Sequence, residues 1–473
     1  MAASSPRKTT SVLAPALLAA SLSACMVGPT YHRPDSASAA TPAFKEAAGW
    51  APANPSDAAD RKDWWTVFGD PTLNDLEGRV LVSNQTLKGA EAAYREARAL
   101  VAQDRAALFP TVGLTGAASA GQTGAAPSRT TYQPSLGGSW APDIWGSVRR
   151  TIQGAKASAQ ASAATLANAR LSAQTEMAVD YIQLRQLDEQ GRLLGATADA
   201  YARTLTIVRN KYAAGVAARG DVLTAQSQAD AARANLADLE QQRARVEHAI
   251  AILAGQAPST VTLAPAPWSL QVPPIPAALP STLLERRPDI AAAERSAAAA
   301  NARIGVQTAA YFPALTLTGQ GGYASSQIGQ LFSASTSFWS VGASVAESVF
   351  DAGARRARVA GARAAYDQTV AAYRQTVLTA LGQVEDNLAA QRVLAAEEAL
   401  RRSAADAANA AETIARNQYA AGTVDYTTVV VAQANALSAR NTLLAIQAQR
   451  LTVAVTLIEA LGGGWRTADM ARS

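Results

Sequence analysis

The sequence predicts a mainly helical, internally duplicated chain that contributes strands to a membrane β-barrel. Three observations lead to this prediction. Residues 207–255 and 414–463 repeat one pattern, which is the signature of an internal duplication. Helical sequence without proline continues for much longer than a globular domain can hold. Short segments also alternate apolar with polar residues, at the length that a tilted strand needs to cross a bilayer.

The duplication is visible in residues that keep one constant separation. The matched pairs are Arg209 with Arg416, Asn210 with Asn417, Tyr212 with Tyr419, Gly215 with Gly422, and Gln226 with Gln433. The repeat extends upstream, because Phe109-Pro110 has its counterpart in Phe312-Pro313. A glycine after a polar last turn is a common helix stop signal. Each copy is therefore predicted to hold a helical hairpin, with tips near 213–221 and 420–428.

The start of the chain resembles a secretory signal over residues 1–24. Arg7 and Lys8 precede an apolar run and then small residues, which is typical of such signals. The segment Leu22-Ser23-Ala24-Cys25 resembles the bacterial lipobox. We therefore predict that Cys25 is the first residue of the mature chain and carries a diacylglycerol. The alternative for this single cysteine is an ordinary buried side chain.

Two β-hairpins are predicted, at residues 111–142 and 314–349. In the first, Val112 and Leu114 alternate with threonine and glycine; in the second, Trp339 and Val341 alternate with serine and glycine. Each strand therefore has one apolar and one polar face, as membrane β-strands do. We expect no run after the signal to be apolar enough for a membrane-spanning helix. The alternative is a pair of half-buried hairpins on a soluble sheet.

A helix is predicted from about residue 148 to residue 212, which at 1.5 Å per residue is roughly 95 to 100 Å long. Its larger residues recur at alternating spacings of four and three, as in Met177, Tyr181 and Leu184. This spacing indicates coiled-coil packing. The second copy shows the same pattern.

Four strands facing lipid cannot close a barrel, and a lipid-facing sheet tolerates no open edge. The chain must therefore be an oligomer that pools its strands. Two chains would give eight strands with an interior filled by side chains, whereas three would give twelve and leave room for a pore.

Several motifs together resemble a known family. They are the segment Cys25-Met26-Val27-Gly28-Pro29-Thr30-Tyr31, the cluster from Trp64-Trp65 to Pro71, Leu283-Leu284-Glu285-Arg286-Arg287-Pro288-Asp289-Ile290, Phe312-Pro313 and the two glycine tips. On these residues the chain resembles TolC-like outer-membrane efflux factors, in the lipoprotein branch of OprM-like and NodT-like proteins. One departure is Ala141-Pro142, which stands where relatives usually have an acidic residue.

The resemblance implies a homotrimer in the Gram-negative outer membrane. Its twelve-stranded barrel would continue into a long periplasmic α-helical barrel with an equatorial belt, anchored to outer-membrane lipid. It also implies two partners, a periplasmic adaptor (membrane fusion) protein and an inner-membrane pump of the RND type. The boundaries that we expect are a signal peptide at 1–24, a lipidated tether and equatorial segment at 25–70, a first repeat at 71–255, an equatorial linker at 256–281, a second repeat at 282–463 and a C-terminal tail at 464–473.

The composition offers no sign of catalysis. Only two histidines and one cysteine occur, without metal-ligand spacing, and no glycine loop follows a buried strand. We therefore expect no enzyme activity, no metal and no cofactor. The net charge of +5 is spread along helices with acidic neighbours, which argues against a nucleic-acid partner. The first functional hypothesis is an exit duct for drugs or other small solutes; the alternatives are an exit duct for type I protein secretion and a structural coiled-coil lipoprotein.

The predicted site lies at the hairpin tips. Gly215, Val216, Gly422 and Thr423 are the expected adaptor-docking residues. The gate candidates are Asp221, Tyr419, Asp425, Tyr426, Thr428 and Val431. In several relatives acidic rings fall on the positions of Thr428 and Val431, so Val431 is expected to supply an apolar constriction instead. Arg209, Arg219 and Arg416 are near enough in sequence to pair with the two aspartates.

Overall fold

The computed structural model describes residues 26–35, 44–47, 63–122, 124, 127–273, 286–463 and 465. The predicted signal peptide and Cys25 lie outside the described residues, as does most of the tail. The chain forms two compact units. We call them the sheet unit, which comprises Met1–Asp35, Ala93–Ala163 and Ala292–Arg374, and the tip unit, which comprises Ser36–Ala92, Ala164–Ala291 and Gln375–Ser473.

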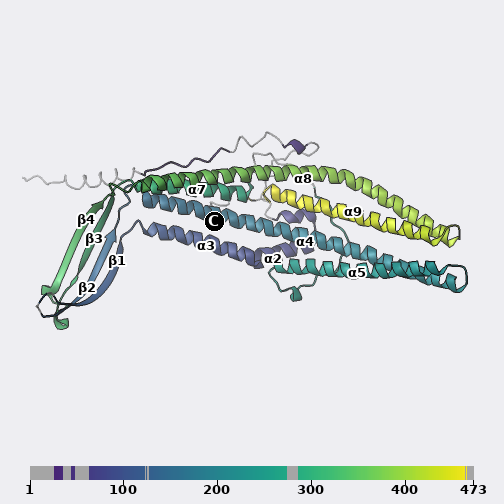
Figure 1. Ribbon diagram of the computed structural model, residues 1–473, viewed down its shortest axis with the longest axis horizontal. Coiled ribbons are helices and arrows are strands. Elements are labelled where there is room, and N and C mark those ends of the chain that lie inside the picture. The colour runs from purple at the N-terminus through teal and green to yellow at the C-terminus, as the bar shows by residue number, and fades with distance from the viewer. Residues whose placement is uncertain are drawn as a thin grey trace, which may run out of the picture. The chain divides into compact units, whose positions relative to one another are not determined.

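Six of the described helices form three pairs of equal length, as an internal duplication predicts (Figure 1). The pairs are α3 (Gln85–Ala106) and α7 (Pro288–Ala309) with 22 residues each, α4 (Ser147–Ala213) and α8 (Ala354–Ala420) with 67 each, and α5 (Arg219–Leu253) and α9 (Tyr426–Ala460) with 35 each. At 1.5 Å per residue, α4 and α8 are each about 100 Å long. The predicted long helix and the positions of both tips are confirmed.

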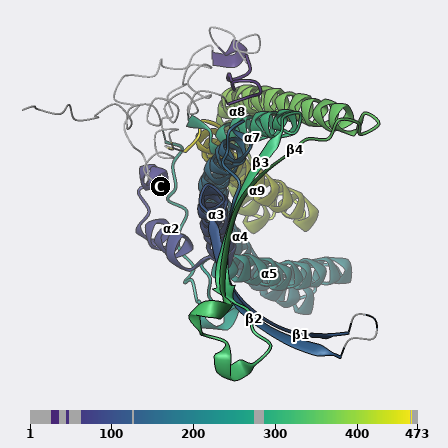
Figure 2. The ribbon, with the colours of Figure 1, turned by 90° about the vertical axis from the view of Figure 1, so that its left-hand side faces the viewer.

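The sheet unit contains one antiparallel sheet in the order β1-β2-β3-β4. Its strands are β1 (Thr111–Gly121), β2 (Arg129–Trp140), β3 (Ala314–Tyr323) and β4 (Ser337–Ala346). The two predicted hairpins thus join through β2 and β3, and Figure 2 shows the curvature of the sheet. Among the described residues, β1 and β4 each keep one edge without a strand partner.

The register places most of the large apolar residues of all four strands on one face, with Phe338 on the other. Leu114 lies opposite Leu136, and Trp140 lies opposite Leu317. Facing positions of antiparallel strands share a side of the sheet, so the predicted alternation is confirmed. The large apolar residues on this face that remain exposed are Val112, Leu114, Leu136, Trp140, Trp339, Val341 and Val345. Since Leu114 is 80% exposed, this face is not the half-buried face of a soluble sheet.

Aspartates cap the helices that follow the second strand of each hairpin. Despite the Ala-Pro pair after β2, the Asp143 carboxylate accepts hydrogen bonds from the backbone N–H groups of Val148 (2.9 Å) and Arg149 (2.8 Å). In the second copy, Asp351 accepts from the Arg355 N–H at 3.0 Å. Both joints therefore satisfy donors at the start of the long helix in the same way.

Residues 26–35, which we call the N-terminal strap, bind along the sheet unit. The Arg150 guanidinium, on the buried side of α4, donates to the carbonyl oxygens of Val27 (3.1 Å) and Gly28 (2.9 Å). A Cβ on Gly28 would lie 2.5 Å from the Cα of Gly305 on α7. Only two glycines permit this approach, so this part of the predicted tether is a docked segment.

The tip unit contains the largest apolar core. Met177, Tyr181 and Leu184 of α4 are at most 1% exposed and pack with Trp64 and Trp65. The predicted coiled-coil spacing therefore marks buried positions. The helix α2 (Pro71–Ser83) begins directly after Asp70, because the Asp70 carboxylate accepts hydrogen bonds from the N–H groups of Thr72 (2.8 Å) and Leu73 (3.2 Å).

In the part of the chain that the structure describes, one helix, α9, is long and apolar enough to span a membrane when judged by length and composition, with a mean hydropathy of 1.3 over its most apolar stretch. By this criterion the expectation that no run after the signal is apolar enough to span a membrane is wrong. In the structure 44% of this stretch is buried. Leu451 and Val455 belong to the core around α4, and Leu457 packs against Leu388 of α8. Such burial is typical of a core helix.

Two glycines with left-handed backbone provide a test of this packing. Gly255 (φ +69°) ends α5 and Gly215 (φ +76°) ends α4, but a Cβ on Gly255 would lie 2.1 Å from the Ser83 carbonyl oxygen, whereas Gly215 faces open space. We expect Gly215→Ala to cost about 1 to 2 kcal/mol for the backbone conformation alone. Gly255→Ala should cost roughly 1 to 3 kcal/mol more, because the backbone must move. Thermal unfolding in detergent, followed by circular dichroism, measures both; equal losses of stability would contradict the contact.

Candidate functional site at the hairpin tips

Both hairpins reverse through the same backbone motif. Gly215 and Gly422 adopt left-handed conformations, with φ of +76° and +75°. The hydrogen bonds of the motif run from Gly215 N to Tyr212 O (2.9 Å), Val216 N to Lys211 O (2.9 Å), Gly422 N to Tyr419 O (3.1 Å) and Thr423 N to Gln418 O (3.0 Å). This is the Schellman arrangement, which favours glycine because other residues are strained there. The role that the sequence gave to both glycines as helix stops is confirmed.

The predicted docking residues lie at the surface of the turns. The Val216 side chain is 73% exposed, and Thr423 is also exposed. The Thr423 hydroxyl donates to the Gln418 carbonyl oxygen at 3.0 Å, so it closes the turn as well as facing solvent. Each tip thus presents a rigid backbone loop, and the first adds one free apolar side chain.

The two aspartates among the gate candidates begin the return helices. Asp425 precedes α9, and its carboxylate accepts from the Thr428 backbone N–H (3.1 Å) and hydroxyl (3.0 Å). Asp221 lies in the first turn of α5 and accepts from the N–H of Ala218 at 3.3 Å. A full capping box makes both of these bonds at one helix start. Here each copy of the repeat retains one half.

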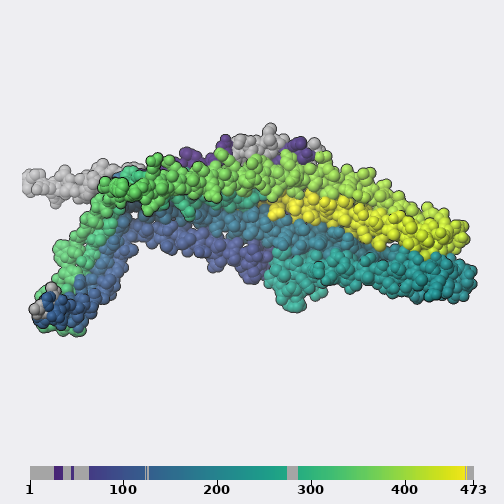
Figure 3. All heavy atoms as spheres, viewed as in Figure 1, coloured from purple at the N-terminus to yellow at the C-terminus, as the bar shows by residue number. Residues whose placement is uncertain are grey.

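The ends of the two hairpins pack against each other within the tip unit, as the space-filling view shows (Figure 3). Tyr426 and Val429 of α9 are 3% exposed and join a buried cluster with residues of α4 and α5. The other buried members of this cluster are Ala198, Tyr201, Leu205, Val208, Ala225, Ala229 and Ala232. The small residues of α5 let the second hairpin approach closely.

Polar and aromatic contacts join the same surfaces. The Lys211 ammonium of the first hairpin lies 4.1 Å from the centre of the Tyr419 ring of the second. The Tyr419 and Tyr426 rings are 5.6 Å apart, and the Tyr426 hydroxyl lies 3.3 Å from Gln228 Oε1. Burial, more than the nearby tyrosines and Asp221, raises the pKa of Tyr426 to about 12. Its phenol is therefore a neutral hydrogen-bond donor at physiological pH.

The remaining candidates face solvent, and two of the three expected arginines have other partners, while Arg219 is exposed. Thr428 is exposed and Val431 is 53% exposed. Arg209 donates to Gln226, and Arg416 lies 3.8 Å from a carboxylate oxygen of Glu412. Sequence reasoning did not identify Lys211 and Gln228. Both contact the opposite copy of the repeat, and spacing within one copy carries no signal for such contacts.

Comparisons with known proteins agree on one family. The family model described as "Outer membrane efflux protein" matches residues 76–256 and 279–463. The chain is 30% identical over 467 residues to the antibiotic efflux pump outer membrane protein ArpC of Pseudomonas putida, covering 97% of this chain and 96% of that one. It is 31% identical over 425 residues to the pyoverdine export outer membrane protein OpmQ of Pseudomonas aeruginosa, covering 87% and 89%. The solved structure of the outer-membrane channel OprN superposes with a TM-score of 0.85 at 32% identity, covering 93% of this chain and all of that one.

Proposed function

The chain belongs to the outer membrane efflux protein family, and we propose that it is the exit duct of a tripartite efflux pump. In this proposal a homotrimer receives solute from an inner-membrane pump of the RND type through a periplasmic adaptor and conducts it passively across the outer membrane. The observation that carries the proposal is a sheet with one uncovered apolar face and two open edges, borne on helices of about 100 Å.

The open edges support the trimer. In hydrocarbon each unpaired backbone N–H or C=O costs several kcal/mol, so β1 and β4 require partners. Pairing β4 of one chain with β1 of the next continues the antiparallel order, and three copies supply twelve strands. Twelve is enough to leave an open interior, whereas eight strands are filled by side chains.

The cargo belongs to the class of small solutes in this proposal. The relatives' names already cover different cargoes, since ArpC is described for antibiotics and OpmQ for pyoverdine. A duct that serves several pumps needs little selectivity of its own. The pump that copurifies with the tagged protein distinguishes this role from type I secretion, because an ATP-driven exporter of proteins would replace the RND pump.

The hairpin tips are the proposed docking and gating elements. Docking on Gly215, Val216, Gly422 and Thr423 is supported by their exposure and by the rigid turns. Closure of the tip is assigned to the contacts between the hairpins at Tyr419 and Tyr426, to Asp221 and Asp425, and to the exposed Thr428 and Val431. The contact of Lys211 with Tyr419 adds a cation–π interaction, which contributes about 0.5 to 1 kcal/mol at an exposed site.

Docking predicts the effect of changing a tip glycine. Gly422→Val places a β-branched side chain at φ +75°, which distorts the turn without touching the sheet. We expect export of drug by the assembled pump to be lost while trimers remain in the outer membrane. The minimal inhibitory concentration of a pump substrate measures this, with membrane fractionation as the control. Unchanged resistance together with normal trimer levels would contradict docking at this tip.

Gating predicts a rise in single-channel conductance when closing contacts are removed. Asp221→Asn with Asp425→Asn removes two charges and leaves the helices capped, because asparagine caps as well as aspartate. We expect this double variant to conduct more than the wild type in planar bilayers. Val431→Ala should also conduct more if the constriction is apolar. Wild-type conductance in all these variants would place the gate elsewhere.

Lipidation predicts the mass of the N-terminal peptide. Two acyl chains bury many methylenes, each contributing about 0.8 kcal/mol, so they anchor the chain beside the barrel. We expect mass spectrometry of the purified protein to find Cys25 as an acylated first residue. An unmodified peptide that contains Cys25, or one that continues into residues 1–24, would disprove the modification.

A further inference from the structure

Helix α7 has two opposite faces with different surroundings in the sheet unit. The N-terminal strap covers one of them: the Tyr31 hydroxyl donates to Glu294 at 2.6 Å, Tyr31 packs against Ala298, and Gly28 lies against Gly305. These contacts fix which side of the helix faces the strap.

A groove of about 830 Å³ lies on the other face of α7. Its lining residues on this helix include Ser296, Arg303 and Gln307. Each is nine positions from a residue on the strap face, in the pairs Glu294 with Arg303, Ala298 with Gln307, and Ser296 with Gly305. Nine residues are about two and a half turns, so each pair points in opposite directions.

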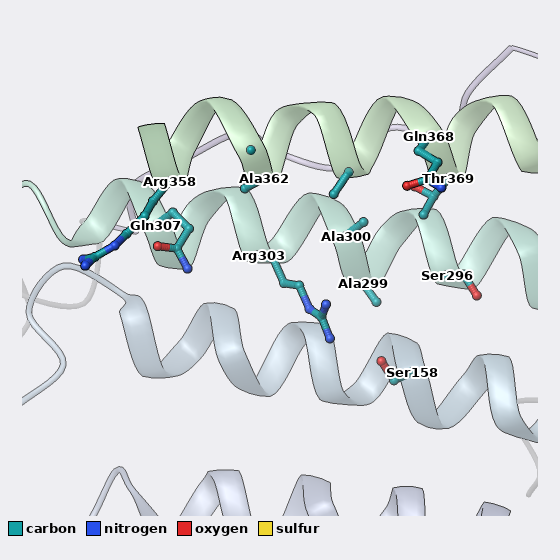
Figure 4. A pocket seen from close by; sticks show the side chains of 12 residues that line it. Ser158, Ser296, Ala299, Ala300, Arg303, Gln307, Arg358, Ala362, Gln368 and Thr369 are labelled. Carbon is teal, nitrogen blue, oxygen red and sulfur yellow. The ribbon is translucent and has the colours of Figure 1, made fainter. Parts of the chain in front are cut away.

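The groove is basic. Its described lining includes Arg303 and Arg358 but no aspartate or glutamate, and the remaining residues are small or neutral. Figure 4 shows Arg303 of α7 reaching toward Ser158 on α4, while Arg358 of α8 lies near Gln307 at the other end. Both arginines are exposed, and among the described residues neither has a carboxylate within ion-pair distance. The two guanidinium groups lie at different positions along the groove and do not converge on one point.

The strap indicates which face is the outside of the duct. Its first described residue, Met26, follows the proposed lipid-bearing Cys25, and the strap is fixed to α4 from Val27 onward. Acyl chains reach the bilayer only from outside a water-filled tube. The strap face of α7 is therefore the outer surface, and the opposite groove faces the lumen.

We propose that Arg303 and Arg358 form a cationic lining of the duct that concentrates anionic solutes. This inference depends on the proposed trimeric duct, because threefold repetition turns the arginines of one chain into rings. Rings of arginine or lysine are the usual lining of anion-selective pores. Low-dielectric walls strengthen the local field and raise the concentration of counter-ions.

Ion selectivity in planar bilayers tests the lining. The reversal potential in a potassium chloride gradient gives the permeability ratio of chloride to potassium. We expect the double variant R303Q/R358Q to lower this ratio roughly twofold in dilute salt, where the Debye length is about 30 Å, and to have little effect near 1 M salt, where it is about 3 Å. A ratio unchanged in dilute salt would overturn the proposal.

A matched control removes a charge from a different face. Lys156 on α4 is exposed and precedes the groove residue Ser158 by two positions, which places it about 200° around the helix. Lys156→Gln should leave the ratio unchanged, and an equal effect would show that only net charge matters.

Thiol labelling tests the orientation separately. A charged thiosulfonate should block current through Ala300→Cys, on the groove, and spare Ala298→Cys, under the strap. The reverse pattern would overturn the assignment of the lumen. Absence of conductance in both the wild type and the variants with altered tips would instead count against the proposed duct.

Discussion

A strand that faces hydrocarbon must have a partner for every backbone N–H and C=O group, because lipid offers none. This constraint governs the chain more than any single contact. The sheet β1-β2-β3-β4 has an apolar face without a cover, and its two outer edges have no partner among the described residues. One copy of the chain is therefore incomplete as a membrane structure. An oligomer that completes the sheet also brings the long helices together. This follows because β2 leads into α4 and β4 leads into α8, each through a short joint capped by an aspartate.

The duplication supplies two similar hairpins that have diverged where they meet. Their helices keep equal lengths and the same glycine turn. Their helix starts differ, because Asp425 caps from outside the helix and Asp221 from within its first turn. Tyr426 is buried between the hairpins, whereas its counterpart Arg219 is exposed. A partner that contacts both tips therefore meets two different surfaces.

The N-terminal strap fixes which side of α7 is covered. The buried Arg150 guanidinium donates hydrogen bonds to two backbone carbonyl oxygens of the strap, and Gly28 of the strap contacts Gly305. In the proposed duct, the covered side of α7 is the outer side and the opposite groove is the inner side. The charge of the inner side then follows from which residues of α7 and α8 point away from the strap.

The sequence by itself determined the features that depend on local spacing. The alternation in β1 to β4, the four-and-three spacing around Tyr181 and the glycine stops at Gly215 and Gly422 each depend on neighbours a few residues away, so they were predicted correctly. Only the tertiary structure decided contacts between distant segments. These include Lys211 on Tyr419, Tyr426 beside Gln228, and the strap along α7. Periodicity shows which residues share a face of a helix. Which neighbour that face meets depends on the rotation and pairing of helices, and these are set by packing between residues about two hundred positions apart.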